Sequence, residues 1–330
     1  MQLQNNHHSK KIVITGITPS GTPHVGNYIG AIKPALELAN KKDFTAYFFI
    51  ADYHSLIGLQ DRTLRQRYIY EVAATWLSLS KESEKYLLYR QSDIPEIMEL
   101  YWILSSITPK GLLNRAHAYK SALDSNKNVN MALFNYPMLM AADILLLGAD
   151  LVPVGKDQIQ HIEIVRDVVG YFNRTYDKCF RLPCSVLNSS KDQVVGLDGR
   201  KMSKSYNNTI PIFASPALLK TLVMKIITNK SSLNDIKSTI DCNIFSLYSH
   251  FASSEEITML SQYYSDGISW KEAKDILFSK INHTFSQARE KYEHFLSNPH
   301  IITNILQENS EKIRIKSRVV LDNIKSIIGL

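Results

Sequence analysis

The stretch Ile12-Val-Ile-Thr-Gly-Ile-Thr-Pro-Ser-Gly-Thr-Pro-His-Val-Gly-Asn27 decides the fold of this chain. It begins with a short β-rich run, Ile12–Thr15, that ends at Gly16, and apolar residues then recur at helical spacing over Gly26–Asn40. Backbone amides at a helix N-terminus attract anions, and glycine lets a nucleotide approach where a Cβ atom would collide. We therefore expect a phosphate or nucleotide site at this first strand-to-helix connection.

The glycine spacing in this connection narrows the kind of nucleotide site. It is not GxGxxG, and it lacks the Lys-Ser/Thr pair of a P-loop, so dinucleotide and Walker-type sites are disfavoured. His24 and Asn27 flank Gly26 and supply two polar side chains that could face the same phosphates. From these residues alone, a glycine turn with a purely structural role remains the alternative.

Strand and helix patterns continue to alternate after this stretch. Further strands are predicted over Thr45–Ile50, Lys85–Tyr89 and Leu151–Val154, with helices over Thr63–Leu79 and Pro95–Ser106 between them. Uninterrupted apolar strands that alternate with amphipathic helices indicate a parallel sheet covered on both faces. We expect an α/β fold with a doubly wound, Rossmann-like domain, whose ligands bind beyond the carboxyl ends of the strands.

Strand patterns disappear from about Tyr206, and helical patterns replace them. They extend over Pro216–Thr228, Glu255–Tyr264, Trp270–Leu296 and Ser310–Ile328. We expect a disordered tail at 1–10, a catalytic domain at 11–205 and a helical domain at 206–330, with the last helix a candidate to pack back on the catalytic domain. That helix is expected to bury an apolar face that includes Ile313 and Ile324 and to leave its charged face, with Arg314 and Arg318, in solvent. The polar segment 110–130 is expected to be a mobile insertion.

The composition is that of an ordinary globular chain. Of 330 residues, 45% are hydrophobic and 21% charged, which excludes disordered and fibrous classes. The net charge of +7 suits a polyanionic partner without proving one. The three cysteines form no CxxC pair, the His7–His8 pair is expected to lie in solvent, and no metal-ligating set is expected. With no apolar leader and no run of 18 apolar residues, we expect a cytoplasmic protein with no membrane partner.

A second motif, Gly199-Arg-Lys-Met-Ser-Lys-Ser205, lies where the two compositional halves meet. Lys201 and Lys204, three positions apart on a loop, can place two cations against moving phosphate charge. A basic loop at a domain boundary is usually mere surface. Its combination with the Pro-x-His-x-Gly-Asn turn about 180 residues earlier is much harder to obtain by chance.

These two motifs resemble the HIGH and KMSKS elements of class I aminoacyl-tRNA synthetases. The order of elements and the intervening sequence look specifically like the bacterial tryptophanyl-tRNA synthetases, from about Ile12 to the end of the chain. The likeness is strongest in Asn135-Tyr-Pro-Met-Leu-Met-Ala-Ala-Asp-Ile-Leu-Leu-Leu147 and in Val152-Pro-Val-Gly-Lys-Asp-Gln-Ile-Gln-His-Ile-Glu-Ile-Val-Arg-Asp167. Asn27 stands where many class I enzymes have a second histidine.

The resemblance implies which residues bind ATP. It implies catalytic roles for His24, Asn27, Lys201 and Lys204, and ribose contacts for Gly155 and Asp157. The implied ATP-binding residues are Thr18, Pro19, Ser20, Gly26, Asn27, Gly155, Lys156, Asp157, Val195, Lys201, Met202, Ser203, Lys204 and Ser205. Whether Val194 or Val195 packs on adenine stays open.

The amino-acid substrate can be argued from one helical face. Tyr136, Met140 and Asp143 are spaced by four and three residues, so they share a face. A carboxylate in an apolar stripe needs a donor, and the indole N–H is a donor with no competing acceptor. We therefore expect Asp143 to recognise L-tryptophan, although a bond to a neighbouring backbone N–H or basic side chain is the alternative. Gln158 is expected to contact the ammonium or carboxylate of tryptophan. His54 is a weaker candidate for the same pocket, and the alternative for it is a histidine that packs in the core.

The reaction implied is two-step aminoacyl transfer. Tryptophan attacks the α-phosphorus of ATP, tryptophanyl-adenylate forms with release of pyrophosphate, and tRNA(Trp) takes the acyl group as AMP leaves. Mg²⁺ would be shared by the pyrophosphate oxygens. The resemblance further implies a homodimer. The alternatives are a tyrosyl-tRNA synthetase, a small nucleotidyltransferase and a catalytically silent synthetase-like regulator that binds tRNA or amino acid.

Overall fold

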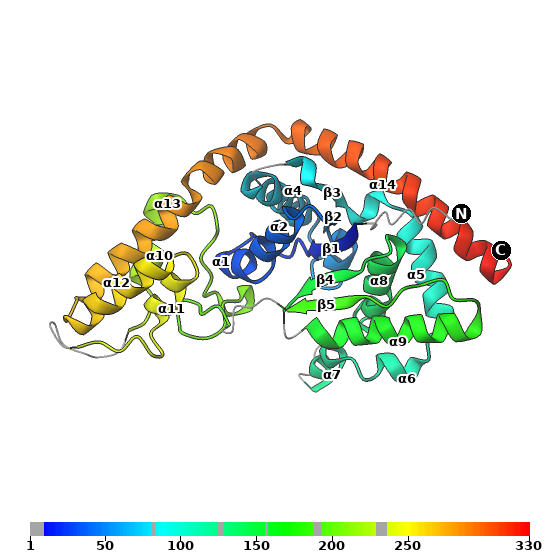
Figure 1. Cartoon of the computed structure of the whole chain (residues 1–330), viewed down its shortest axis with the longest axis horizontal. Coiled ribbons are helices and arrows are strands. Elements are labelled where there is room, and N and C mark those ends of the chain that lie inside the picture. The colour runs from blue at the N-terminus through cyan, green and yellow to red at the C-terminus, as the bar shows by residue number, and fades with distance from the viewer. Residues whose placement is uncertain (1–9, 81–82, 125–128, 156–157, 188–192, 229–235) are drawn as a thin grey trace, which may run out of the picture. The chain divides into compact units, whose positions relative to one another are not determined.

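The computed structural model describes residues 10–80, 83–124, 129–155, 158–187, 193–228 and 236–330 (Figure 1). The tail expected at 1–10, with the His7–His8 pair, lies outside them except for Lys10. The chain forms two compact units. Unit 1 consists of Met1–Ser20, Pro34–Asn188 and Asn298–Leu330, and unit 2 of Gly21–Lys33 and Ser189–Ser297.

Unit 1 is built on a five-stranded parallel sheet. Its strands are β1 (Lys11–Ile17), β2 (Phe44–Ile50), β3 (Tyr86–Arg90), β4 (Leu151–Val154) and β5 (Cys184–Leu187), in the order β3-β2-β1-β4-β5. Ile17 pairs with Ile50, and Ile50 with Arg90, so three strands end in register at one edge. The first four strands confirm the sequence-based expectation, whereas β5 was not predicted.

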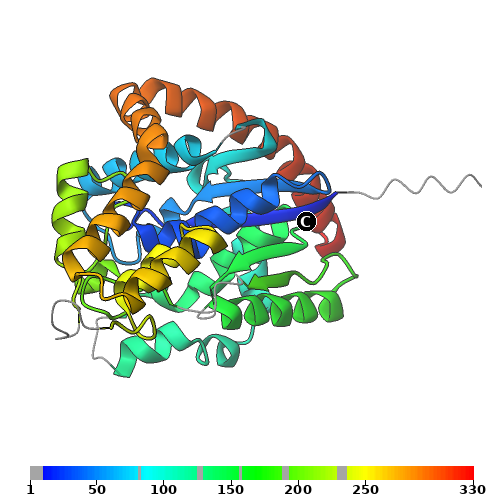
Figure 2. The same ribbon diagram turned by 60° about the vertical axis from the view of Figure 1, so that its left-hand side comes forward.

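Helices cover both faces of this sheet. The side chains of β2 alternate between the two faces, and on each face they pack against helices. Phe48 stacks on Trp76 of α4 (Arg62–Leu79), with ring centroids 4.5 Å apart. Phe49, on the opposite face, belongs to a core shared with α5 (Glu96–Ile107), α8 (Met131–Leu146) and α9 (Ile159–Thr175). Figure 1 and Figure 2 both show α9 running beside β5. The doubly wound α/β expectation is therefore confirmed.

Shorter elements complete unit 1. They are α2 (Lys33–Ala39), whose first residue belongs to unit 2, α3 (Asp52–Ser55), η2 (Ser83–Lys85), η3 (Gln91–Asp93), α6 (Lys110–Leu113) and α7 (His117–Asp124). In the segment 110–130, expected to be a mobile insertion, the described residues thus include two short helices.

The long helix α14 (Pro299–Ile328) packs on β3 and α5 within unit 1 (Figure 1). Ile313 and Ile324 are buried in the core that α5, α8 and α9 share, as the sequence predicted. The prediction that the charged face of this helix lies in solvent was wrong in part. Both Arg314 and Arg318 donate from Nε to Oε1 of the buried Glu96, over 3.3 and 3.1 Å.

Unit 2 contains α1 (Val25–Asn27), the π-helical turn η1 (Tyr28–Ile32), η5 (Lys204–Tyr206), α10 (Pro216–Met224), α11 (Asn243–Ser249), α12 (Ser254–Ser265) and α13 (Trp270–Ser297). Its core is aromatic. Tyr28 lies edge-on to Phe285 of α13, and Phe213 stacks on Tyr292 at 4.4 Å between ring centroids. Among the described residues, no helix is both long and apolar enough to cross a bilayer.

The boundaries of the two compact units differ from the domain boundary expected between residues 205 and 206. Gly21–Lys33 joins unit 2 because the backbone N–H of Val25 donates to Ile210 over 2.8 Å, and that of Ile212 donates to Pro23 over 3.1 Å. Residues 299–328 join unit 1 through α14. The assignment of 206–330 to tRNA binding concerns function and stays a prediction.

Candidate functional site

The first group of candidate side chains lies where the strands of unit 1 end. Asp52 follows β2 by two residues, and Gln91 follows β3 directly. Because these strands end in register, both residues lie at the same edge of the sheet. This is the edge where parallel α/β sheets bind their ligands.

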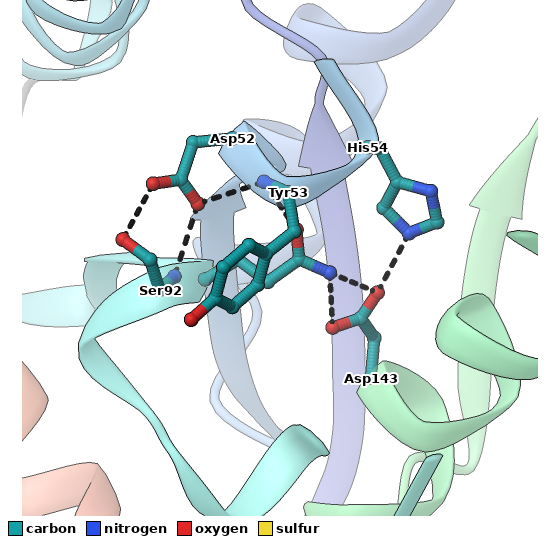
Figure 3. A network of polar contacts seen from close by, with 6 residues as sticks. Asp52, Tyr53, His54, Ser92 and Asp143 are labelled. Atoms are coloured by element: carbon teal, nitrogen blue, oxygen red, sulfur yellow. Dashed lines mark hydrogen bonds and ion pairs between the residues drawn. The ribbon is translucent and has the colours of Figure 1, made fainter. Parts of the chain in front are cut away.

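Asp143 of α8 reaches this edge from the helical layer (Figure 3). Its carboxylate is 1% exposed, and Oδ2 lies 3.1 Å from Nε2 of His54. Nε2 of Gln91 donates to both carboxylate oxygens over 2.9 Å. Burial raises the pKa of Asp143, while the hydrogen bonds and charge of His54 and the bond from Gln91 act in the opposite direction.

The structure thus brings His54 and Asp143 together, two residues that sequence reasoning proposed for one pocket. Gln91 was missed. A glutamine after an apolar strand has no distinctive spacing, but its position directly after β3 was a usable signal, because strand ends collect ligand-binding side chains.

A second polar chain runs between α8 and α9 and consists of Tyr136, His161 and Gln158. His161 was not among the site residues predicted from the sequence. The Tyr136 hydroxyl bonds to Nε2 of His161, whose Nδ1 lies 2.9 Å from Oε1 of Gln158. Burial raises the pKa of Tyr136 to about 12, so its hydroxyl stays protonated at neutral pH. Met140, one turn before Asp143, packs half-buried against the unit 1 core.

The remaining unit 1 residues named from the sequence lie at strand ends or outside the described residues. Thr18, Pro19 and Ser20 follow β1, and the Ser20 N–H donates to the Thr18 carbonyl over 2.8 Å. Gly155 follows β4, and its carbonyl accepts from the Gln158 N–H over 2.9 Å. Lys156 and Asp157 lie outside the described residues.

The second group, in unit 2, joins the glycine turn to the lysine loop. The N–H of Gly26 donates to the thioether sulfur of Met202 over 3.2 Å. A Cβ on Gly26 would lie 3.0 Å from the imidazole of His24 and 3.4 Å from Cβ of Met202. Asn27 accepts from the His24 N–H at Oδ1 over 3.1 Å, so it organises this turn.

The lysine loop is folded by its own hydrogen bonds. Met202 N–H donates to Val194 over 2.8 Å, and Val195 forms a β-bridge with Lys201. The buried Asn208 accepts from the Ser203 N–H over 2.8 Å and donates to the Lys201 carbonyl over 3.1 Å. The hydroxyls of Ser203 and Ser205 lie 2.9 Å apart. The loop therefore has a defined shape rather than that of a plain surface connection.

Lys204 ties this loop to the glycine turn. Its ammonium donates to the Gly21 carbonyl over 2.6 Å. Gly21 has a φ of +147°, and a Cβ there would meet the Lys204 side chain at 2.9 Å. Burial, and then the charge of Lys204, lower the pKa of His24 to about 4, so its imidazole is neutral near pH 7.

Comparisons with known proteins agree with one another. The family model of class I tRNA synthetases (W and Y) matches residues 5–293. A tryptophan–tRNA ligase of Neisseria meningitidis is 43% identical over 331 residues, which cover 98% of each chain.

Solved structures give the same result. A tryptophanyl-tRNA synthetase of Campylobacter jejuni, crystallised with ADP and tryptophan, is 41% identical with a TM-score of 0.89, over 97% of this chain and 100% of that one. A tyrosyl-tRNA synthetase of Archaeoglobus fulgidus is 17% identical with a TM-score of 0.66, over 86% of this chain and 90% of that one. The second likeness shows the fold alone.

Proposed function

Because the chain belongs to the class I tRNA synthetases of the tryptophan and tyrosine family and attaches tryptophan to tRNA, we propose that Asp143 recognises the substrate indole and that the lysine loop binds the triphosphate of ATP. The tyrosine alternative is not favoured, since relatives at 43–44% identity are tryptophan–tRNA ligases.

The single observation that supports the tryptophan site is the buried carboxylate of Asp143. Its acceptor oxygens lie beside His54 and Gln91 at the carboxyl edge of the sheet. An indole N–H can only donate, so it complements this acceptor, whereas phenylalanine would leave it unpaired. Met140 on the same helix would pack against the indole ring.

Tyr136 and Gln158 would contact the polar end of tryptophan. The Tyr136–His161–Gln158 chain holds the side chains of two neighbouring helices in one arrangement. An amide such as Gln158 offers both an acceptor for an ammonium group and a donor for a carboxylate. We propose that it positions the carboxylate that attacks ATP.

The first chemical step needs no covalent nucleophile on the protein. The tryptophan carboxylate attacks the α-phosphorus, the bond from that phosphorus to the bridging oxygen breaks, and pyrophosphate leaves with the electron pair. Lys201 and Lys204 would stabilise the charge that develops on pyrophosphate, and the neutral His24 with Asn27 would donate hydrogen bonds to it. The acyl group then passes from the adenylate to a ribose hydroxyl of the tRNA, and AMP leaves.

Other ATP contacts follow the expected residues. We propose that Thr18, Pro19, Ser20 and Gly26 line the nucleotide, that Gly155, Lys156 and Asp157 contact its ribose, and that Val195, Met202, Ser203 and Ser205 complete the loop around it. ATP is a substrate of this family, and we propose that it arrives as its Mg²⁺ complex. Among the described residues, no three His, Cys, Asp or Glu side chains cluster as a metal site.

We further propose that tRNA(Trp) is the acceptor, that the protein works as a homodimer in the cytoplasm, and that residues 206–330 contact the tRNA. The net charge of +7 supports a polyanionic partner, and Lys/Arg-to-phosphate contacts should weaken steeply with salt.

One assay tests the function as a whole. Pyrophosphate exchange into ATP is measured with each of the twenty amino acids in turn. We expect exchange with tryptophan alone at low substrate concentration. Preferred exchange with tyrosine, or no exchange with any amino acid, would overturn the assignment.

A further inference from the structure

Asp143 is itself held by Gln91, whose orientation is determined by a hydrogen bond from the backbone. Gln91 is 0% exposed, and its Oε1 accepts from the N–H of Tyr53 over 3.1 Å. A backbone N–H can only donate, so the amide oxygen must face Tyr53 and the amide nitrogen must face Asp143. That nitrogen lies 2.9 Å from each of the two carboxylate oxygens.

A second carboxylate fastens the turn that carries Gln91. Asp52, which is 7% exposed, accepts at Oδ1 from the Ser92 N–H over 3.0 Å and at Oδ2 from the Ser92 hydroxyl over 2.5 Å. Oδ1 of Asp52 also accepts from the Tyr53 N–H over 3.1 Å. The two turns that follow β2 and β3 are therefore joined at Ser92, the residue next to Gln91.

This arrangement leaves one acceptor position of the Asp143 carboxylate unused among the described residues. A carboxylate oxygen has two acceptor positions. Oδ2 accepts from Gln91 and lies beside His54, whereas Oδ1 accepts from Gln91 alone among the described residues. The Gln91 amide, which contacts both oxygens, sets the plane of the carboxylate and with it the direction of the remaining Oδ1 acceptor position.

We propose that Gln91 is a specificity-determining positioning residue, which orients Asp143 toward the indole N–H, and that the Asp52–Ser92 pair holds Gln91 in place. This inference rests on the proposed function, because it takes Asp143 as the residue that recognises indole. Gln91 acts through Asp143, so its loss should affect recognition of the indole N–H and leave the handling of ATP unchanged.

The test compares tryptophan with β-(3-benzothienyl)alanine, in which sulfur replaces the indole N–H. The readout is the ratio of kcat/KM for the two amino acids in pyrophosphate exchange. We expect Gln91→Met, which keeps the chain length and removes the amide, to lower this ratio about tenfold through the KM for tryptophan, with the KM for ATP unchanged. Ser92→Ala should lower the ratio in the same direction, and Ser92→Thr, which keeps the hydroxyl, should restore it.

Two reference variants separate the possible failures. Asp143→Ala tests the proposed function: if it keeps the wild-type ratio, the indole contact itself is wrong. Ser105→Ala removes a hydroxyl that donates to its own helix over 2.7 Å and should leave the ratio unchanged.

The positioning role is overturned if Asp143→Ala lowers the ratio while Gln91→Met and Ser92→Ala keep it. It is also overturned if the KM values for both amino acids rise equally, since a merely structural role predicts that result. Should Gln91→Met fail to fold, as judged by thermal unfolding, the Ser92→Ala and Ser92→Thr pair decides.

Discussion

The backbone N–H of Gly26 donates to the sulfur of Met202 over 3.2 Å, a hydrogen bond between residues 176 positions apart in the chain. It joins the glycine turn to the lysine loop inside unit 2. The ammonium of Lys204, which bonds to the Gly21 carbonyl, makes a second link between the same two segments. The two motifs that identify the family are therefore one packed structure, and a change in either should disturb both.

A methyl group on Gly26 tests this packing. In Gly26→Ala the new Cβ would meet the His24 ring at 3.0 Å, so the ring or the turn must shift. We expect pyrophosphate exchange to fall roughly tenfold or more, measured as kcat/KM for ATP. Gly30→Ala is the matched control, because a Cβ there meets nothing within 4 Å. A Gly26→Ala protein as active as Gly30→Ala would show that the contact has no catalytic importance.

Removal of the Lys204 ammonium should affect chemistry rather than tryptophan binding. We expect Lys204→Ala to lower the rate of adenylate formation about 10²–10³-fold, because a cation that stabilises developing pyrophosphate charge is lost. Tryptophan affinity, measured by equilibrium dialysis, should stay unchanged. Lys220→Ala, which removes a half-exposed lysine paired with Asp275, serves as the control. Equal losses of rate and affinity in Lys204→Ala would mean that the loop is structural.

Asp143→Ala should lose selectivity between tryptophan and phenylalanine. A hydrogen bond to a charged acceptor contributes about 1.5–3 kcal/mol, so the selectivity in pyrophosphate exchange should fall about 10–200-fold. Asp143→Asn keeps the side-chain volume and one acceptor oxygen, so its selectivity should lie between those of the wild type and Asp143→Ala. Retention of wild-type selectivity by Asp143→Ala would remove this residue from the proposed pocket.

The depressed pKa of His24 predicts a defined acid sensitivity. Its pKa is about 4 in the folded protein and 6.5 as an ordinary value, so the unfolded chain binds more protons between these pH values. The free energy of unfolding of the wild type should therefore fall as pH drops from 6.5 to about 4. The fall should exceed that of His24→Gln by about 2 kcal/mol. Urea unfolding of both proteins at half-unit pH steps measures the difference. His300→Gln, at an exposed histidine, should track the wild type; a His24→Gln curve parallel to the wild type would contradict the prediction.

The charge pairs of Glu96 predict an asymmetry in stability. Glu96 is 4% exposed, whereas the side chains of Arg314 and Arg318 are 34% and 58% exposed. The arginines can return to water, but the carboxylate cannot. We expect the double variant Arg314→Ala/Arg318→Ala to lower the free energy of unfolding, measured with urea, by about 2 kcal/mol, and Glu96→Gln to lower it less. The reverse order would show that the arginines contribute mainly by packing.

Much of the sheet could be predicted because its central strands are uninterrupted apolar runs, such as Thr45–Ile50. The strand β5 was missed, since Cys184-Ser-Val-Leu187 is a four-residue edge strand with polar or exposed residues at its start. The helix α11 was missed for a similar reason, because seven residues show too little periodicity.

The sequence predicted that Asp143 and His54 share one pocket but did not identify Gln91, the other side chain that contacts the Asp143 carboxylate. The Gln91–Asp143 pair joins positions 52 residues apart, and the Arg318–Glu96 pair joins positions 222 apart. Side-chain spacing on one helix carries no information about either partner. Only the topology, which sets β3 beside β2 and α14 beside α5, brings them together.

The placement of α14 has a consequence for how the protein is made. Residues 299–328 are synthesised after the whole of unit 2, yet Ile313, Leu321 and Ile324 complete a core whose first strand begins at Lys11. A growing chain thus has an incomplete unit 1, with Glu96 lacking both arginines, until α14 emerges from the ribosome. Unit 2, most of which is continuous in sequence, can form before α14 is made, so we expect the core of unit 1 to be completed after unit 2 has folded.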